Sequence, residues 1–309
     1  MTEDLLTRSP TTPGESVIAA PIDEVDEARL RRRHTIRRHR LGIFGATLVG
    51  VVVFAALLGP LLYGVDPNAQ NLSERLMLPF SYSDSGAFHL LGTDELGRDV
   101  LARLFAGGRS SLSVVLAGVL LGCIIGMTLG VLAGFYGGIS DLFIMRMVDA
   151  QLAVPLIVSA LVVATALGTG FMNTALALGI ASWALYARLI RAETLKLREE
   201  SYFDAGVALG ATNLRLMVRH LLPNLLGTML IVASLEMGGL VITESSLSYL
   251  GMGMQPPDAS WGQMIRSAQT VIYTNSWLAV IPGVAIMITV LGLNLVGDWL
   301  RDLLDPHYD

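Results

Sequence analysis

The chain has 309 residues, of which 53% are hydrophobic and only 15% are charged, and its net charge is −5. Soluble globular domains have about 25% charged residues. This chain therefore has too little charge to cover a surface that faces water, which argues against a soluble enzyme and excludes disorder, a coiled coil and a collagen-like rod. The single cysteine, Cys123, excludes a disulfide framework and a cysteine-based metal site.

Residues 1–40 are the only long polar stretch, and they form two blocks. Residues 1–28 hold seven acidic residues, one basic residue and three prolines, which predicts a flexible tail. Residues 29–40 hold seven arginines, two histidines and no acidic residue. A basic run can bind nucleic acid, but an apolar stretch follows this one directly. We therefore interpret it as a cytoplasmic anchor, expect no nucleic-acid partner, and disfavour a cleavable signal peptide.

Six stretches are long and apolar enough to cross a membrane. A helical span needs about 20 apolar residues, and helices satisfy their own backbone polar groups in lipid. The stretches are residues 41–63, 111–134, 143–168, 172–190, 222–243 and 277–298. We expect an all-α polytopic membrane protein, with a first span at 41–63, a loop at 64–110 and a five-helix core at 111–309.

The distribution of basic residues predicts the orientation. With the N-terminus in the cytoplasm, 16 of the 21 basic residues lie inside, as the positive-inside rule requires. An even number of spans then places both termini in the cytoplasm and the 64–110 loop outside. The segment GTDELGRD (92–99) in that loop has two glycines and alternating charges, which predicts a folded turn with Asp–Arg pairs.

The second span carries a glycine at every fourth position, which forms a groove of missing side chains along one helix face. This groove permits close packing of another helix, either within the same bundle or from a partner membrane protein. The glycines are Gly118, Gly122, Gly126, Gly130 and Gly134.

Charged residues inside the spans are candidates for a polar pathway, because burying a charge in hydrocarbon is costly. Arg146 and Asp149 are three residues apart and are expected to pair on one helix face. Glu236 has no partner nearby in the sequence. Asp149 and Glu236 are the two candidate pathway residues, with snorkelling and simple packing as the alternatives.

Motifs of common enzymes are missing from the chain. The five histidines all lie outside the interiors of the spans, which argues against a histidine-based catalytic or metal site in the membrane. The only lysine, Lys196, follows a leucine and so does not end a phosphate-binding loop. We expect neither enzymatic activity nor ATP binding by this chain.

The segment 199–223 between the fourth and fifth spans predicts a cytoplasmic elbow of two short helices. Gly210 favours the positive φ of a helix end, Thr212 can cap the second helix, and Pro223 is expected to stop it and start the fifth span. Apolar and charged side chains share this segment, which suits a groove on a cytoplasmic partner. An amphipathic helix at the lipid surface is the alternative.

Within the elbow, Asp204-Ala205-Gly206 precedes Gly210 by three residues, and His220-Leu221-Leu222-Pro223 follows nine residues later. This spacing resembles the EAA loop of ABC importer permeases, in which the loop is the coupling helix that docks into the ATPase subunit. Asp204 stands at the leading Glu of that motif, Gly206 at its second Ala and His220 at its Ile. The residues that the resemblance assigns to coupling are Tyr202, Phe203, Asp204, Ala205, Gly206, Gly210, Arg219, His220 and Pro223.

Three further blocks are HLLGTDELGRDVLARLFAGGRSSLSVV (89–115), ESSLSYLGMGMQPPDASWGQMI (244–265) and NLVGDWLRDLLDPHYD (294–309). They resemble the dipeptide, oligopeptide and nickel branch of the ABC importers, and specifically its second, C-type permease subunit. The resemblance covers about residues 41–309.

This resemblance implies the type I ABC importer permease fold in the bacterial cytoplasmic membrane. It implies four kinds of partner: a second permease in a heterodimer, two ATPase subunits that carry ATP and Mg²⁺, an external substrate-binding protein, and the lipid bilayer. No cofactor is expected on this chain. The implied substrate is a di- or oligopeptide, and nickel or another small solute stays open.

Two other classes of function are weaker alternatives. A proton-coupled secondary transporter could use Asp149 and Glu236 as a relay, but the spans show no obvious inverted repeat. A membrane enzyme such as an intramembrane protease is disfavoured by the positions of the histidines.

Overall fold

The structure is a computed structural model that describes residues 22–83 and 86–304, with side chains at 40–83 and 86–303. Residues 1–40 and 41–309 form two separate units. Helix α1 (Ile22–Tyr63) begins in the first unit, so the arginine-rich block 29–40 is helical. Most of the acidic block 1–28 lies outside the described residues.

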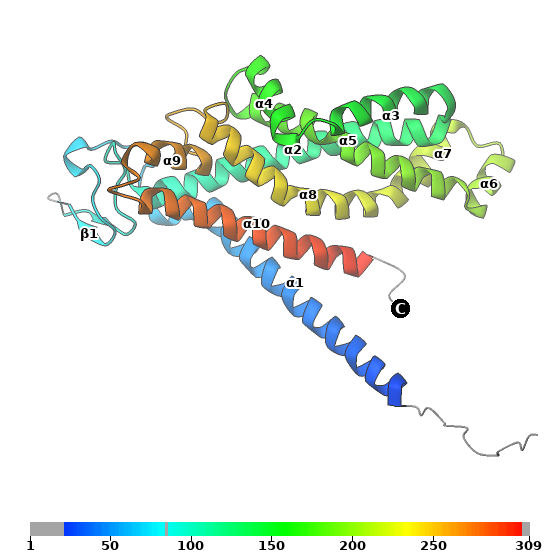
Figure 1. The fold of residues 1–309 in the computed structure, drawn as a ribbon, viewed down its shortest axis with the longest axis horizontal. Coiled ribbons are helices and arrows are strands. Elements are labelled where there is room, and N and C mark those ends of the chain that lie inside the picture. The colour runs from blue at the N-terminus through cyan, green and yellow to red at the C-terminus, as the bar shows by residue number, and fades with distance from the viewer. Residues whose placement is uncertain (1–21, 84–85, 305–309) are drawn as a thin grey trace, which may run out of the picture. The chain divides into compact units, whose positions relative to one another are not determined.

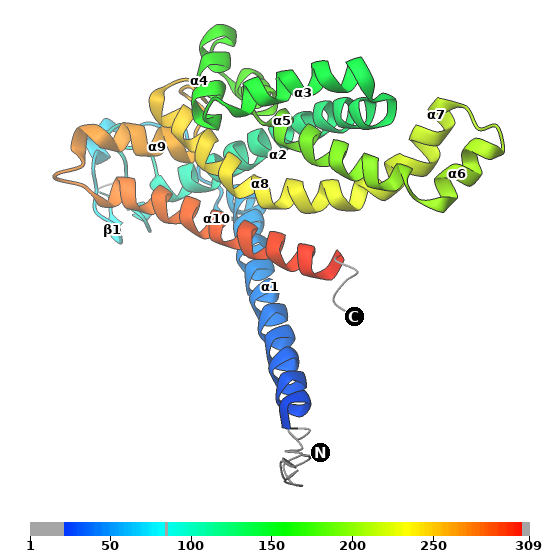
Figure 2. The same cartoon turned by 45° about the vertical axis from the view of Figure 1, so that its right-hand side comes forward.

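The second unit is a helical bundle with one short hairpin. Figures 1 and 2 show the hairpin and α9 at one end and α6 and α7 at the other. The hairpin pairs β1 (Ser81–Tyr82) with β2 (Phe88–His89) in antiparallel register. The remaining α-helices are α2 (Val100–Tyr136), α3 (Gly138–Leu152), α4 (Leu156–Leu167), α5 (Phe171–Arg198), α6 (Ser201–Ala208), α7 (Asn213–Leu216), α8 (Leu222–Leu250), α9 (Trp261–Ala268) and α10 (Trp277–Leu304).

Five helices are long and apolar enough to span a membrane, and a bent helix pair makes a sixth candidate. The bent pair, α3 and α4, turns by 96° and replaces the continuous span predicted at 143–168. The stretch bends because Pro155 lies between the two helices. Proline removes a backbone donor, and it disfavours the helical conformation of the residue before it.

The second and fifth predicted spans are shorter than the helices that contain them. Helix α2 begins at Val100, where Asp99 caps it by accepting a hydrogen bond of 2.9 Å from Ala102 N. Helix α8 continues to Leu250, and Gly251 ends it in the left-handed conformation. Hydropathy alone missed these extensions because their polar side chains are buried against the protein.

The glycine stripe of α2 packs against α5 along its whole length. A Cβ atom at Gly126 would lie 2.9 Å from the carbonyl oxygen of Trp183, and one at Gly130 would lie 2.7 Å from that of Ala187. Gly118, Gly122 and Gly134 also face α5. Because these neighbours include backbone atoms, which cannot rotate away, only glycine permits this separation of the two helices.

A side chain within the stripe should therefore destabilise the bundle. Gly126→Leu is expected to cost at least the 1–3 kcal/mol typical of an overpacked core, roughly estimated, and to lower the thermal midpoint of the detergent-purified protein measured by tryptophan fluorescence. Gly50→Leu is the matched control, because a Cβ at Gly50 meets nothing within 4 Å. Equal midpoints for the two variants would contradict the role of the stripe.

Candidate functional site

Helices α6 and α7 form an elbow between α5 and α8 (Figure 1). Gly210 joins them with φ of +75°, and Thr212 Oγ1 accepts a hydrogen bond of 3.4 Å from Arg215 N at the start of α7. The predicted joint and the predicted cap are both confirmed. The elbow follows directly from the sequence because a positive φ and an N-cap are local properties of the chain.

The inner face of the elbow packs on the ends of the long helices. Phe203 is 6% exposed, and its ring lies edge-on to that of Phe135 on α2, with 6.3 Å between centroids. Leu216 is also buried, and a Cβ at Gly206 would lie 3.0 Å from Leu216 Cδ2. Phe203 and Gly206, which were expected to contact a partner, thus face inward and hold the two elbow helices together.

The outer face of the elbow presents apolar side chains to its surroundings. Leu209 is 88% exposed and Leu214 is 67% exposed, beside the exposed Val207 and Val218. The other residues predicted to couple lie on the surface, and His220 is half-buried among them. The exposed members are Tyr202, Asp204, Ala205, Gly210, Arg219 and Pro223.

The elbow joins α8 without a break. Residues Met217–Leu221 form a π-helical turn, and Leu222 N donates to Met217 O at its end. The prediction that Pro223 stops the helix is wrong. In a regular α-helix its ring would clash with the carbonyl four residues earlier, and the wider π turn relieves that clash. Helix α7 therefore runs into α8 through a continuous helical backbone.

Two ion pairs hold α3 against α5 near the elbow. Arg191 Nε lies 2.7 Å from Asp141 Oδ1, and Arg188 pairs with Asp149. The predicted pair of Arg146 with Asp149 is wrong, because the bundle brings α5 to the same face of α3, and Arg146 is exposed instead. Arg188 lies 39 residues from Asp149 in the sequence, so the spacing within α3 does not reveal it as the partner.

Glu236, the other candidate pathway residue, is half-buried on α8. It has no hydrogen-bond or ion-pair partner among the residues that the structure describes. Asp149 is 58% exposed and paired with Arg188. The two carboxyl groups thus have different surroundings: Asp149 is paired across two helices, and Glu236 has no such partner in the part of the chain that the structure describes.

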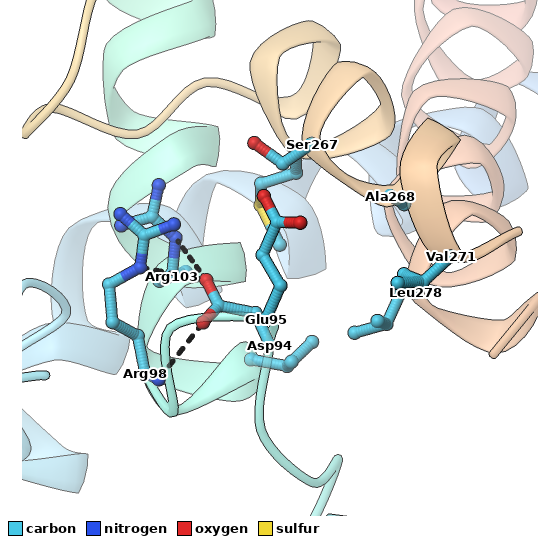
Figure 3. A pocket seen from close by; sticks show the side chains of 10 residues that line it. Asp94, Glu95, Arg98, Arg103, Ser267, Ala268, Val271 and Leu278 are labelled. Carbon is cyan, nitrogen blue, oxygen red and sulfur yellow. Dashed lines mark hydrogen bonds and ion pairs between the residues drawn. The ribbon is translucent and has the colours of Figure 1, made fainter. Parts of the chain in front are cut away.

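The loop before α2 forms a polar network at the opposite end of the unit. Arg98 Nε lies 2.7 Å from Asp94 Oδ2, and Arg103 Nε lies 3.7 Å from the same oxygen. Figure 3 shows both guanidinium groups directed toward Asp94. Gly97 has φ of +70°, and a Cβ there would collide with the backbone of Asn71. The predicted turn with Asp–Arg pairs is confirmed.

Asp99 joins three parts of the chain in the same region. It caps α2, accepts a hydrogen bond of 3.1 Å from Tyr63 Oη at the end of α1, and lies 2.8 Å from His89 Nδ1 on β2. The loop 64–99 is thus anchored to the ends of two long helices by buried polar contacts. The adjacent cavity in Figure 3 has a volume of only about 20 Å³, enough for one water molecule but not for a peptide.

Glu244 is a fully buried carboxyl group that sequence reasoning missed. Ser248 Oγ donates to Glu244 Oε1 at 2.8 Å, Ser245 Oγ donates to Oε2 at 3.4 Å, and Ser111 on α2 is a third partner. This cluster joins α8 to α2. The signal for this cluster in the sequence is the run of serines at 245–248, because Ser248 lies one helical turn after Glu244. The predicted fifth span ends at residue 243, one residue before Glu244.

Two family models match the chain. Residues 126–309 match the model described as binding-protein-dependent transport system inner membrane component. Residues 31–79 match the N-terminal TM domain of oligopeptide transport permease C.

Curated relatives match over most of their length. The di/tripeptide transport system permease protein DppC of Pseudomonas aeruginosa (strain UCBPP-PA14) is 40% identical over 270 residues, which are 87% of this chain and 89% of that protein. The dipeptide transport system permease protein DppC of Alkalihalophilus pseudofirmus is 36% identical over 271 residues, 88% of this chain and 87% of that protein.

A solved structure shares the arrangement of the helices. An inward-facing conformation of the MetNI methionine ABC transporter superimposes with a TM-score of 0.53 and 19% identity, covering 66% of this chain and 96% of that chain. At this identity the likeness concerns the fold alone.

The Glu244 cluster should contribute measurably to stability. Glu244→Leu leaves buried serine hydroxyls without their acceptor, which costs about 1–3 kcal/mol, whereas Glu244→Gln keeps a carbonyl acceptor and should cost less. The thermal midpoint of the purified protein is expected to rank wild type, Gln variant, Leu variant. A Leu variant as stable as wild type would contradict this assignment.

Proposed function

The chain belongs to the family of binding-protein-dependent transport system inner membrane components, and on that premise we propose that it is the membrane-spanning subunit of an ATP-driven peptide importer. It is a multi-pass protein of the bacterial inner membrane with the fold of a type I ABC importer permease. Such subunits are transport components without catalytic activity, so the membrane-enzyme alternative is set aside.

The relatives' names support a di- or oligopeptide as the substrate. Both DppC proteins match over nearly their full length, and the N-terminal match is to an oligopeptide permease domain. No specific feature of the described residues favours nickel or another small solute, so the peptide is the substrate we propose.

The family implies a partner permease, an ATPase and a substrate-binding protein. We propose that this chain forms a heterodimer with a second permease and that two ATPase subunits bind ATP and Mg²⁺. We also propose that the substrate-binding protein docks on the outer face. The absence of a phosphate-binding lysine loop from the sequence supports placing the nucleotide on another chain. The distribution of basic residues supports cytoplasmic termini and a cytoplasmic elbow.

The single observation that carries the coupling mechanism is the exposed apolar face of the elbow at the junction of two long helices. Leu209 and Leu214 suit an apolar groove on an ATPase subunit. Motion of the elbow would reach α8 through the continuous helix at 217–222 and α5 through α6. Because α5 is locked to α2 by the glycine stripe and to α3 by two ion pairs, these three helices would move together and open the path alternately to either side.

The proposed function is tested by uptake of a labelled dipeptide into vesicles that contain the assembled importer. Uptake should require external binding protein and ATP, and it should stop when the ATPase subunits carry inactivating substitutions. Uptake that persists on a proton gradient alone would support the secondary transporter and overturn the importer.

Strain at the elbow joint should uncouple ATP hydrolysis from transport. Gly210→Val places a β-branched residue at φ of +75°, which costs about 1–2 kcal/mol, and the elbow must distort. We expect peptide uptake to fall by about tenfold while the subunit still inserts and assembles. Gly210→Asn is the matched control, because asparagine tolerates this conformation. If the Val variant keeps both peptide uptake and coupled ATPase activity, the elbow assignment is wrong.

The tip of the elbow should also determine binding of the ATPase. Leu209→Glu places a charge in the proposed apolar contact, and we expect the ATPase subunits to be lost during co-purification. Leu72→Glu is the control, because Leu72 is similarly exposed, at 69%, but lies in the loop at the other end of the unit. Retention of the ATPase by the Leu209 variant would place the docking surface elsewhere.

A further inference from the structure

A groove on the second unit is bounded by α1, α2, α8 and α10. Its volume is about 230 Å³, and its walls are apolar, with Val49, Val53 and Leu57 from α1, Leu112 and Leu116 from α2, and Leu293 from α10. Arg109 on α2 is the only charged residue in the lining. The proposed coupling mechanism uses neither this apolar groove nor the charge of Arg109.

The path of α1 across its neighbours creates this groove. At one end, Gly42 and Gly45 bring α1 into contact with α10, where Trp299 and Leu295 lie against them. Toward the other end, Gly59 faces Phe105 on α2. Residues 49–57 lie between these two contacts, where α1 passes from one helix to the other and leaves the space open.

Arg109 lacks an anionic partner within the described chain. Its side chain is exposed, and it forms no hydrogen bond or ion pair with the described residues, whereas Arg98 and Arg103 both bind Asp94. A charged side chain within an apolar span is costly unless an anion or water meets it. None of the side chains in 40–83 or 86–303 supplies that partner, so an anion or water from elsewhere must meet Arg109.

The depth of the groove suits a lipid molecule. Gly108 packs on Ala56, which lies seven residues before the end of α1 at Tyr63, about 10 Å at 1.5 Å per residue. A long arginine side chain can reach from that depth toward the headgroup layer. The apolar wall continues inward to Val49, about 21 Å from the same end, in the direction that an acyl chain takes.

We propose that this groove binds a membrane phospholipid, with the phosphate on the guanidinium of Arg109 and one acyl chain along α1 and α2. Arginine binds phosphate through two parallel hydrogen bonds, which a phospholipid headgroup can accept. The bound lipid fills the gap between α1 and the bundle and so fastens α1 to α2. This inference does not depend on the identity of the transported substrate.

Lipid retention by the assembled importer tests the site, with phosphatidylglycerol as the probe and native mass spectrometry as the readout. Wild type should retain phosphatidylglycerol after a detergent wash, and Arg109→Gln should bind it about tenfold more weakly, as expected for one charge-assisted contact. Arg109→Lys should recover part of the binding. Arg75→Gln, which removes an exposed arginine of the 64–99 loop, should bind as wild type does. Equal losses in Arg75→Gln and Arg109→Gln would overturn the site.

Two further measurements keep the test decisive if the Arg109 variants fold poorly. Val53→Trp fills the groove without changing the charge and should also reduce phosphatidylglycerol binding. A photoreactive amino acid at position 53 should cross-link to phospholipid in vesicles of phosphatidylethanolamine and phosphatidylglycerol. A cross-link to the second permease instead would overturn the lipid site and show that the groove is a protein interface.

Discussion

The close approach of α2 and α5 along the glycine stripe is the contact on which the other features of the bundle depend. Lipid supplies little hydrophobic force between membrane helices, so their association relies on close packing, and here backbone atoms of α5 lie directly against the glycines. Helix α5 leads into the elbow, and α2 begins at the polar network around Asp94 and Asp99. The paired helices therefore connect the polar network at one end of the second unit with the elbow at the other.

The two ends use opposite physical means. At the Asp94 end, buried ion pairs and hydrogen bonds hold an irregular loop, because a carboxylate shared by two arginines and by backbone donors leaves few alternative arrangements. At the elbow end, only one face is buried, through Phe203 and Leu216, and the other presents leucines. The rigid loop at the Asp94 end suits a fixed scaffold. The exposed apolar face of the elbow suits a contact that a partner completes.

Much of the fold could be predicted because it rests on local patterns. Apolar length located the spans, the four-residue spacing of glycines identified a close-packed face, and Gly210 with Thr212 located the joint of the elbow. The predictions that are wrong concern which side chains form ion pairs and where the helices are broken or continuous. Asp149 pairs with Arg188 rather than Arg146, because the pairing depends on how α3 crosses α5, which no spacing within α3 reveals.

By itself, the sequence determined that this protein lies in a membrane, how many apolar stretches it has, and which segment resembles a coupling loop, since length, hydropathy and turn chemistry are properties of neighbouring residues. The tertiary structure decided that α5 is the helix that packs against the glycine face of α2. It also decided that Phe203 faces inward, that Glu244 is buried among serines, and that no side chain of the described residues pairs with Arg109. These outcomes depend on helices that are far apart in the chain, and only the packed bundle brings their side chains together or keeps them apart.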